Sequence, residues 1–149
     1  MIKIISFLLI SSVYLSAVSY WTLSGLTKVN VYVNNKVSLL KPETIELIKD
    51  KMYKTLQDEG VKTKQQDSPI LIIAFSEIEN DDMHYVHIRL SLGEDVQTFR
   101  VDKSATFALT YDESDFIEAD KNELDKAILE SADALVANFK AQFKEDKEE

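Results

Sequence analysis

Two histidines are the residues in this chain best suited to acid–base or metal chemistry, because the chain has no cysteine. They are His84 and His87, and the even positions that follow, 86, 88, 90 and 92, are apolar. This alternation predicts a β-strand, in which residues three apart point to opposite faces. We therefore expect no ion to be chelated by both histidines. Asp81 or Asp82 could join one of them only as a weak surface ligand.

An acidic stretch at residues 112–120 suggests calcium, but its spacing does not fit the calcium loop of an EF-hand. Counted from Asp112, that loop would need ligands or a glycine where Ser114, Phe116 and Ile117 stand. We expect a solvated acidic loop that also brings negative charge to the start of the last helix. Nothing selects two of the 26 acidic residues as the paired carboxylates of a glycoside hydrolase.

The composition excludes several other chemistries. Without cysteine there is no disulfide, no thiolate metal site, no cysteine nucleophile and no lipid on an N-terminal cysteine. With only 3 glycines, the chain contains neither a Gly-x-Ser-x-Gly turn nor a phosphate-binding loop. A net charge of −9 argues against nucleic acid as the main partner. The sequence thus favours a non-enzymatic protein without a cofactor.

The N-terminal segment resembles an export signal. Lys3 precedes a mostly apolar run at residues 4–15, and the small residues 16–19 follow, with Ala17 and Ser19 at the positions that signal peptidase reads. This predicts a signal peptide at 1–19 and a periplasmic or secreted single domain at 20–149. The alternative is an uncleaved membrane anchor reaching about residue 23, with Trp21 at the membrane interface.

The rest of the chain shows the periodicities of strands and helices. Pro42 and Gly60 bracket an amphipathic helix at 42–59, and a second helix is expected from Asp120 to about Lys144, before a frayed acidic tail at 144–149. Strands are expected at 27–33, 70–75, 84–92, 96–101 and 105–111, with a short extended segment at 37–40 and turns at 77–82 and 93–95.

This order predicts an α+β two-layer sandwich. Its sheet would be mainly antiparallel with four or five strands, and two amphipathic helices would cover one face, in the order β-α-β-β-(β)-β-α. The second sheet face would then be free to bind a partner. Its candidate binding residues are Tyr32, Tyr85, His87 and Thr98.

The layout of an exported domain, with a helix followed by Gly60 and a valine, resembles small envelope-assembly subunits of Gram-negative bacteria. Examples are the lipopolysaccharide-assembly subunit LptE and the CsgG-like secretion proteins, which usually carry a lipid-bearing cysteine. We therefore expect a non-catalytic envelope-assembly or protein-binding role, with another envelope or secreted protein as partner. A membrane would be met only through the N-terminal segment. A secreted inhibitor or immunity-type protein and a small carboxylate-dependent hydrolase remain the alternatives.

Overall fold

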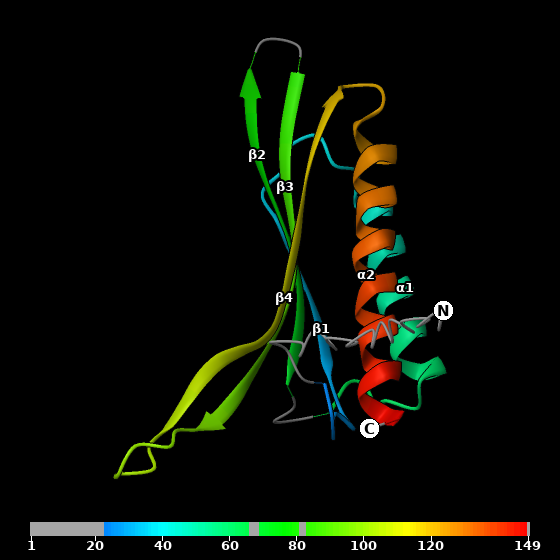
Figure 1. Ribbon diagram of the computed structural model, residues 1–149. Coiled ribbons are helices and arrows are strands. Elements are labelled where there is room, and N and C mark those ends of the chain that lie inside the picture. The colour runs from blue at the N-terminus through cyan, green and yellow to red at the C-terminus, as the bar shows by residue number, and fades with distance from the viewer. Residues whose placement is uncertain (1–22, 66–68, 81–82, 149) are drawn as a thin grey trace, which may run out of the picture.

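The computed structural model describes residues 23–65, 69–80 and 83–148 as four strands and two helices (Figure 1). Their order is β-α-β-β-β-α, as expected for an α+β fold. The elements are β1 (Asn30–Asn35), α1 (Pro42–Asp58), β2 (Ile70–Asn80), β3 (Met83–Gln97), β4 (Ala105–Asp120) and α2 (Leu124–Glu148).

The strands form a single mixed sheet in the order β1-β2-β3-β4. The helix α1 connects β1 to β2, and these two strands run parallel. The remaining neighbours, β2 with β3 and β3 with β4, are antiparallel hairpin pairs. Chain order and strand order therefore coincide, and β1 and β4 are the two edges of the sheet.

Strands run through most of the predicted turn at 77–82, although the β2–β3 reversal does fall between Asn80 and Met83, and the predicted turn at 93–95 is wrong. Residues 77–80 belong to β2, and residues 93–95 belong to β3. The sheet instead accommodates Gly93 by a shift of register between Leu92 and Gly93, where β4 contributes an extra residue. The chain reverses only after Gln97, so residues 98–101 of the predicted strand at 96–101 lie in the turn and only 96–97 belong to β3. The predicted strand at 105–111 is the first part of β4.

The predicted acidic loop at 112–120 is also wrong, since these residues form the second half of β4. The side chains alternate between the two sheet faces, and two acids on the helix side have donors there. Asn138 of α2 donates to Glu113 at 2.7 Å, and Ser131 donates to Asp115 at 2.7 Å. Because side chains of α2 donate hydrogen bonds to these carboxylates, they are accommodated on the helix side, and a strand forms where acidity alone suggested a loop.

Both helices lie on one face of the sheet (Figure 1). Pro42 begins α1, where a missing N–H costs nothing, and Gly60 follows its end with a left-handed φ of 78°. The second helix continues through the predicted frayed tail. There Gln142 donates to Asp146 at 2.6 Å, and Lys147 donates to the carbonyl of Glu59 at 2.8 Å, so the last turns are tied to their neighbours.

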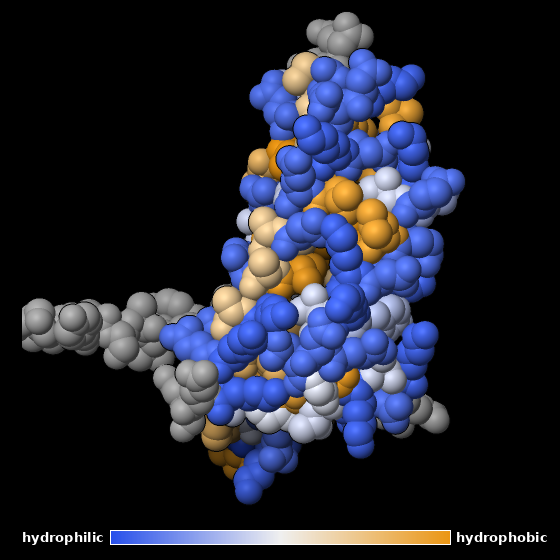
Figure 2. Space-filling model, turned by 90° about the vertical axis from the view of Figure 1, so that its right-hand side faces the viewer, coloured by the Kyte–Doolittle hydropathy of each residue, from blue (hydrophilic) through white to orange (hydrophobic). Residues whose placement is uncertain are grey.

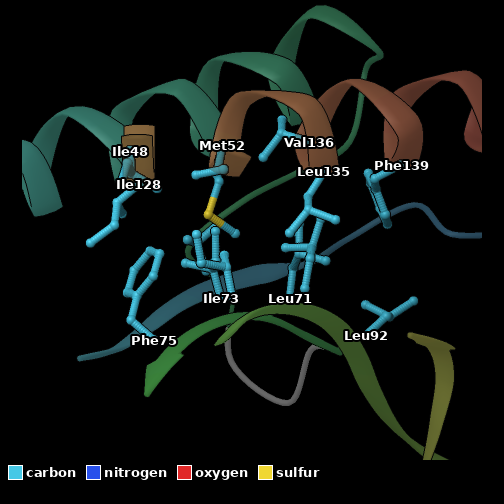
Figure 3. Close-up of a cluster of buried hydrophobic side chains, with 14 of the residues drawn as sticks. Ile48, Met52, Leu71, Ile73, Phe75, Leu92, Ile128, Leu135, Val136 and Phe139 are labelled. Atoms are coloured by element: carbon cyan, nitrogen blue, oxygen red, sulfur yellow. The ribbon is translucent and has the colours of Figure 1, made fainter. Parts of the chain in front are cut away.

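The hydrophobic core fills the space between the helices and the covered sheet face (Figure 3). Ile48 and Met52 of α1 meet Ile73 and Phe75 of β2, and each is at most 1 % exposed. Side chains of α2 that complete this layer are Ile128, Leu135, Val136 and Phe139. On the opposite, outward side of the helices the surface is mostly hydrophilic, with small apolar areas between polar side chains (Figure 2).

The predicted signal peptide at 1–19 and the alternative anchor to residue 23 fall almost wholly outside the described residues. Within the described ranges, no helix combines the length and the apolar character needed to cross a bilayer.

Candidate functional site

The sheet face that carries no helix presents a group of large apolar side chains near the β2–β3 turn. We call it the aromatic patch and define it as Ile78, Tyr85, His87 and Phe116. Phe116 is 75 % exposed, Ile78 is 73 % exposed and Tyr85 is 41 % exposed. Side chains of this size usually lie in a core, so their grouping on one uncovered face distinguishes this part of the surface.

The strand register brings the patch together from three strands. Tyr85 is opposite Ile78 of β2, and His87 is opposite Phe116 of β4. The rings of His87 and Phe116 are stacked, with their centroids 4.3 Å apart and their planes at 10°. The Tyr85 hydroxyl donates to Glu118 at 3.3 Å at the rim. The patch is therefore an ordered apolar surface with an acidic side.

A polar cluster follows the patch along the same face. Arg89 Nε lies 2.6 Å from Asp112 Oδ1, a second guanidinium nitrogen lies 3.0 Å from Oδ2, and Ser91 donates to Oδ1 at 2.7 Å. The hydrogen bond from Arg89 lowers the pKa of Asp112, although burial acts in the opposite direction. The same bond raises the pKa of Arg89. The ion pair between Arg89 and Asp112 therefore lies in the middle of the open face and forms the boundary of the aromatic patch on that side.

Of the four predicted binding residues, the structure brings only Tyr85 and His87 together. Tyr32 is on the same face and 58 % exposed, but it lies at the β1 edge opposite Ile72, away from the patch. Thr98 lies at the far end of the β3–β4 hairpin, where its N–H donates to the Ser104 carbonyl at 2.9 Å. The structure therefore places Tyr32 on the open face but apart from the patch, and Thr98 near the end of the hairpin, so the four residues do not form one continuous surface.

Sequence reasoning missed Ile78 and Phe116, the two most exposed members of the patch. Ile78 lies in a segment that was expected to be an acidic turn, and Phe116 in one expected to be an acidic loop. The alternation of side chains could have indicated them. Ile78 is at an even position of β2 and Phe116 at an even position in the second half of β4, and both sets of positions face the open side of the sheet.

The two histidines do lie on opposite faces, as their spacing predicted. His84 is 3 % exposed under the helices, and its Nδ1 lies 2.5 Å from Glu77 Oε1. The other carboxylate oxygen of Glu77 accepts the N–H of Ser38 at 3.2 Å. This buried pair joins β2, β3 and the β1–α1 loop, and therefore acts as a structural polar contact. Asp81 and Asp82, considered as ligands beside a histidine, are outside the described residues.

If the chain were a carboxylate-dependent hydrolase, the shallow groove between β4 and α2 would be the candidate active site. It has a volume of about 380 Å³, and Tyr111, Asp112, Glu113 and Glu145 contribute to its lining. A general acid needs a raised carboxyl pKa, whereas Arg89 lowers that of Asp112. Glu113 accepts hydrogen bonds from Tyr111 at 2.6 Å and Asn138 at 2.7 Å. The bond to Arg89 thus makes Asp112 unsuited to act as a general acid.

Burial, together with the bond to Glu113, strongly raises the pKa of Tyr111. Its hydroxyl is therefore a persistent donor and not a base at neutral pH. No group of three or more potential metal-ligating side chains occurs within residues 23–65, 69–80 and 83–148.

Comparison with known proteins finds distant structural likenesses and no family. No protein-family model matches the chain, and no curated protein is significantly similar to it in sequence. One solved structure, of an uncharacterized protein, is 10 % identical with a TM-score of 0.46, covering 83 % of this chain and 95 % of its own. A PelC variant from Paraburkholderia phytofirmans, solved as a dodecamer, is 15 % identical with a TM-score of 0.42. That similarity covers 74 % of this chain and 84 % of the PelC chain. Neither likeness transfers a site residue.

Proposed function

We propose that this chain is an exported, non-catalytic binding protein that attaches to another envelope or secreted protein through the aromatic patch on its open sheet face. The observation that carries the proposal is the exposure of Phe116 and Ile78 beside the stacked His87 ring. The sequence of residues 1–19 supports the location, since it resembles an export signal in combining Lys3, an apolar run and small residues at the positions that signal peptidase reads.

The patch has the mixed character of a binding surface. Aromatic side chains supply most of the energy in protein interfaces because they bury a large apolar area with few rotatable bonds. Phe116 and Tyr85 provide such area, and the Glu118 carboxylate beside Tyr85 offers a charged rim contact. A partner with an apolar pocket and a basic residue next to it would satisfy both. The acidic chain would also attract a basic partner over a distance.

The test places a photo-crosslinking amino acid at position 116 in cells that make the protein naturally. A matched probe replaces Lys126, which is exposed on α2 on the opposite side of the molecule. We expect a discrete adduct with one different protein from position 116 and none from position 126. Equal yields at both positions, no adduct, or an adduct only with a second copy of this chain would contradict the proposal.

Purified components then measure the contribution of the patch. We expect Phe116→Ser combined with Ile78→Ser to weaken binding of the crosslinked protein by at least about tenfold, because the central apolar contacts of an interface dominate its affinity. Tyr32→Ser, at the β1 edge of the same face, is the matched control and should leave the affinity within about twofold. Circular dichroism should show that all variants remain folded. Equal affinities for all of them would exclude the patch as the binding surface.

A further inference from the structure

The β3–β4 hairpin continues beyond the register shift at Gly93 and extends past the ends of both helices (Figure 1). We call residues 93–109 the projecting hairpin. Its end is closed by its own hydrogen bonds. Thr98 N–H donates to the Ser104 carbonyl at 2.9 Å, Lys103 N–H donates to the Arg100 carbonyl at 2.9 Å, and the Thr98 and Ser104 hydroxyls lie 3.1 Å apart. The end of the hairpin is therefore a defined turn.

Two apolar side chains occupy the end of this hairpin and are fully exposed to solvent. Phe99 has a relative exposure of 109 % and Val101 of 105 %, the highest values among the exposed large hydrophobic residues. Turn positions are usually occupied by glycine, proline or small polar residues, which favour a sharp chain reversal and expose no large apolar side chain to water. Phe99 and Val101 therefore contribute no buried area to the fold, and only a surface outside the molecule could bury them.

Charge at the end of the hairpin differs in sign from that of the chain. Arg100 lies between Phe99 and Val101, and Lys103 follows, so residues 98–104 carry two basic groups against Asp102, while the chain carries a net charge of −9. Asp102 accepts the N–H of Ser104 at 3.2 Å. In the described part of the chain, neither basic residue forms an ion pair. Both cations are thus free to bind anions beyond the tip.

We propose that the end of the projecting hairpin docks on an anionic lipid bilayer. Phe99 and Val101 enter the boundary between headgroups and acyl chains, and Arg100 and Lys103 bind the headgroup phosphates. The internally bonded turn suits this environment, because backbone polar groups near hydrocarbon must find partners within the protein. The rest of the chain is acidic and is repelled by anionic lipid. Only the end of the projecting hairpin therefore contacts the membrane.

This membrane contact lies outside the N-terminal segment, the only membrane contact expected from the sequence, and it is independent of the proposed role of the aromatic patch. Two inserted side chains bury less apolar area than one fatty-acyl chain, which by itself gives only marginal binding. The contact is therefore weak and reversible. It depends on anionic lipid and on low ionic strength.

A site-specific probe tests the contact without interference from the apolar N-terminal segment. The chain has no cysteine, so Val101→Cys in the full chain carries a single environment-sensitive fluorophore. We expect a blue shift, and quenching by spin-labelled lipid, when vesicles of phosphatidylcholine and phosphatidylglycerol are added. The same label at Ser114, on the open sheet face, should not respond. A silent label at 101 overturns the proposal, and so does an equal response at 114.

Charge reversal tests the role of the two cations. Arg100→Glu with Lys103→Glu should reduce the response at 101 on anionic vesicles by at least about 25-fold, since each basic residue near an anionic surface contributes roughly a factor of five and both are lost. Lys121→Glu with Lys126→Glu changes the net charge by the same amount at the other end of β4 and should reduce the response by less than about threefold. Equal losses in the two pairs would show that only the net charge matters and would overturn the docking geometry.

Discussion

The projecting hairpin continues β3 and β4, two of the four strands of the helix-covered sheet, yet the two regions differ in what their side chains contact. Along β3, the residues from Val86 to Leu92 that face the helices are at most 1 % exposed. Beyond Gly93 no helix covers either face (Figure 1): Phe99 points into solvent, and Phe107, whose ring lies against Gly93, is still 57 % exposed. Alternation therefore determines which residues share a face, but only the neighbouring layer determines whether that face is buried.

The largest difference between the two regions should appear when an aromatic ring is removed from each. Phe75→Ala leaves a cavity between β2 and the helices and should lower the free energy of unfolding by about 3–5 kcal/mol. Phe99→Ala removes a ring that contacts water only, and should change it by less than about 0.5 kcal/mol. Urea denaturation measures both. Similar losses would show that the hairpin end packs against the body in solution.

A smaller effect is expected for carboxylates on the two sheet faces. Glu77→Ala leaves the buried His84 ring and the Ser38 N–H without their acceptor, and should cost about 1–3 kcal/mol. The matched change Glu118→Ala removes an exposed carboxylate from the open face and should cost less than about 0.5 kcal/mol. Denaturation at pH 7 measures the pair. A Glu77 variant as stable as the Glu118 variant would argue against the polar contact under the helices.

Tyr111 allows the covered face to be tested by pH. Tyr111→Phe should cost about 1 kcal/mol at neutral pH, because Glu113 loses a donor. Burial raises the pKa of Tyr111 above its ordinary value of 10.0, so the folded state keeps a proton that the unfolded state releases. The contribution of the protonated Tyr111 hydroxyl to the free energy of unfolding is therefore complete below pH 10 and declines above it by about 1.4 kcal/mol per pH unit. The stability of the natural protein should thus meet that of the Tyr111→Phe variant within about one pH unit above pH 10 and then fall below it, and parallel pH profiles would contradict this.

The ion pair on the open face should contribute less. Asp112→Asn should lower the free energy of unfolding by at most about 1 kcal/mol at pH 7, because both partners of the pair are partly solvated. Since Arg89 lowers the pKa of Asp112, the contribution is complete above the ordinary value of 3.8 and disappears as the pH falls through the lower folded value. Denaturation between pH 2 and about 7 measures it. A difference that persists at the acid end would assign the effect to something other than charge.

The smallest effect is expected at the junction of the two regions. A Cβ added at Gly93 would lie 2.2 Å from Cζ of Phe107, so the ring must move. Because Phe107 is exposed, we expect Gly93→Ala to cost less than about 1 kcal/mol and Phe107→Ala to remove that cost in the double variant. A double-mutant cycle by urea denaturation measures the coupling. A loss above about 2 kcal/mol would instead mean that the backbone at Gly93 is constrained.

The elements with simple periodicity could be predicted from the sequence. Pro42 and Gly60 defined α1 closely, and the even positions 86–92 identified the buried face of β3. The α+β class and the placement of both helices on one face followed from these elements. The parallel pairing of β1 with β2 was not predicted, because it depends on how α1 packs over the sheet.

The candidate site was only half predictable, for a physical reason. Tyr85 and His87 lie in a strand with clear alternation, whereas Phe116 and Ile78 lie among acidic residues that resemble a loop. Such residues form strands here because partners elsewhere compensate them, as Ser131 does for Asp115. A partner in another element leaves no trace in the local sequence. The same applies to Gly93, whose role depends on a register shift rather than on a turn.

The acidic second half of β4 also opposes association between copies of this chain. As an edge strand of 16 residues, β4 has backbone groups along its outer side that another strand could bind, which is how fibrils begin. Five carboxylates between residues 112 and 120 would face carboxylates if two such edges met. At neutral pH this repulsion opposes edge-to-edge polymerisation, and the safeguard weakens in acid.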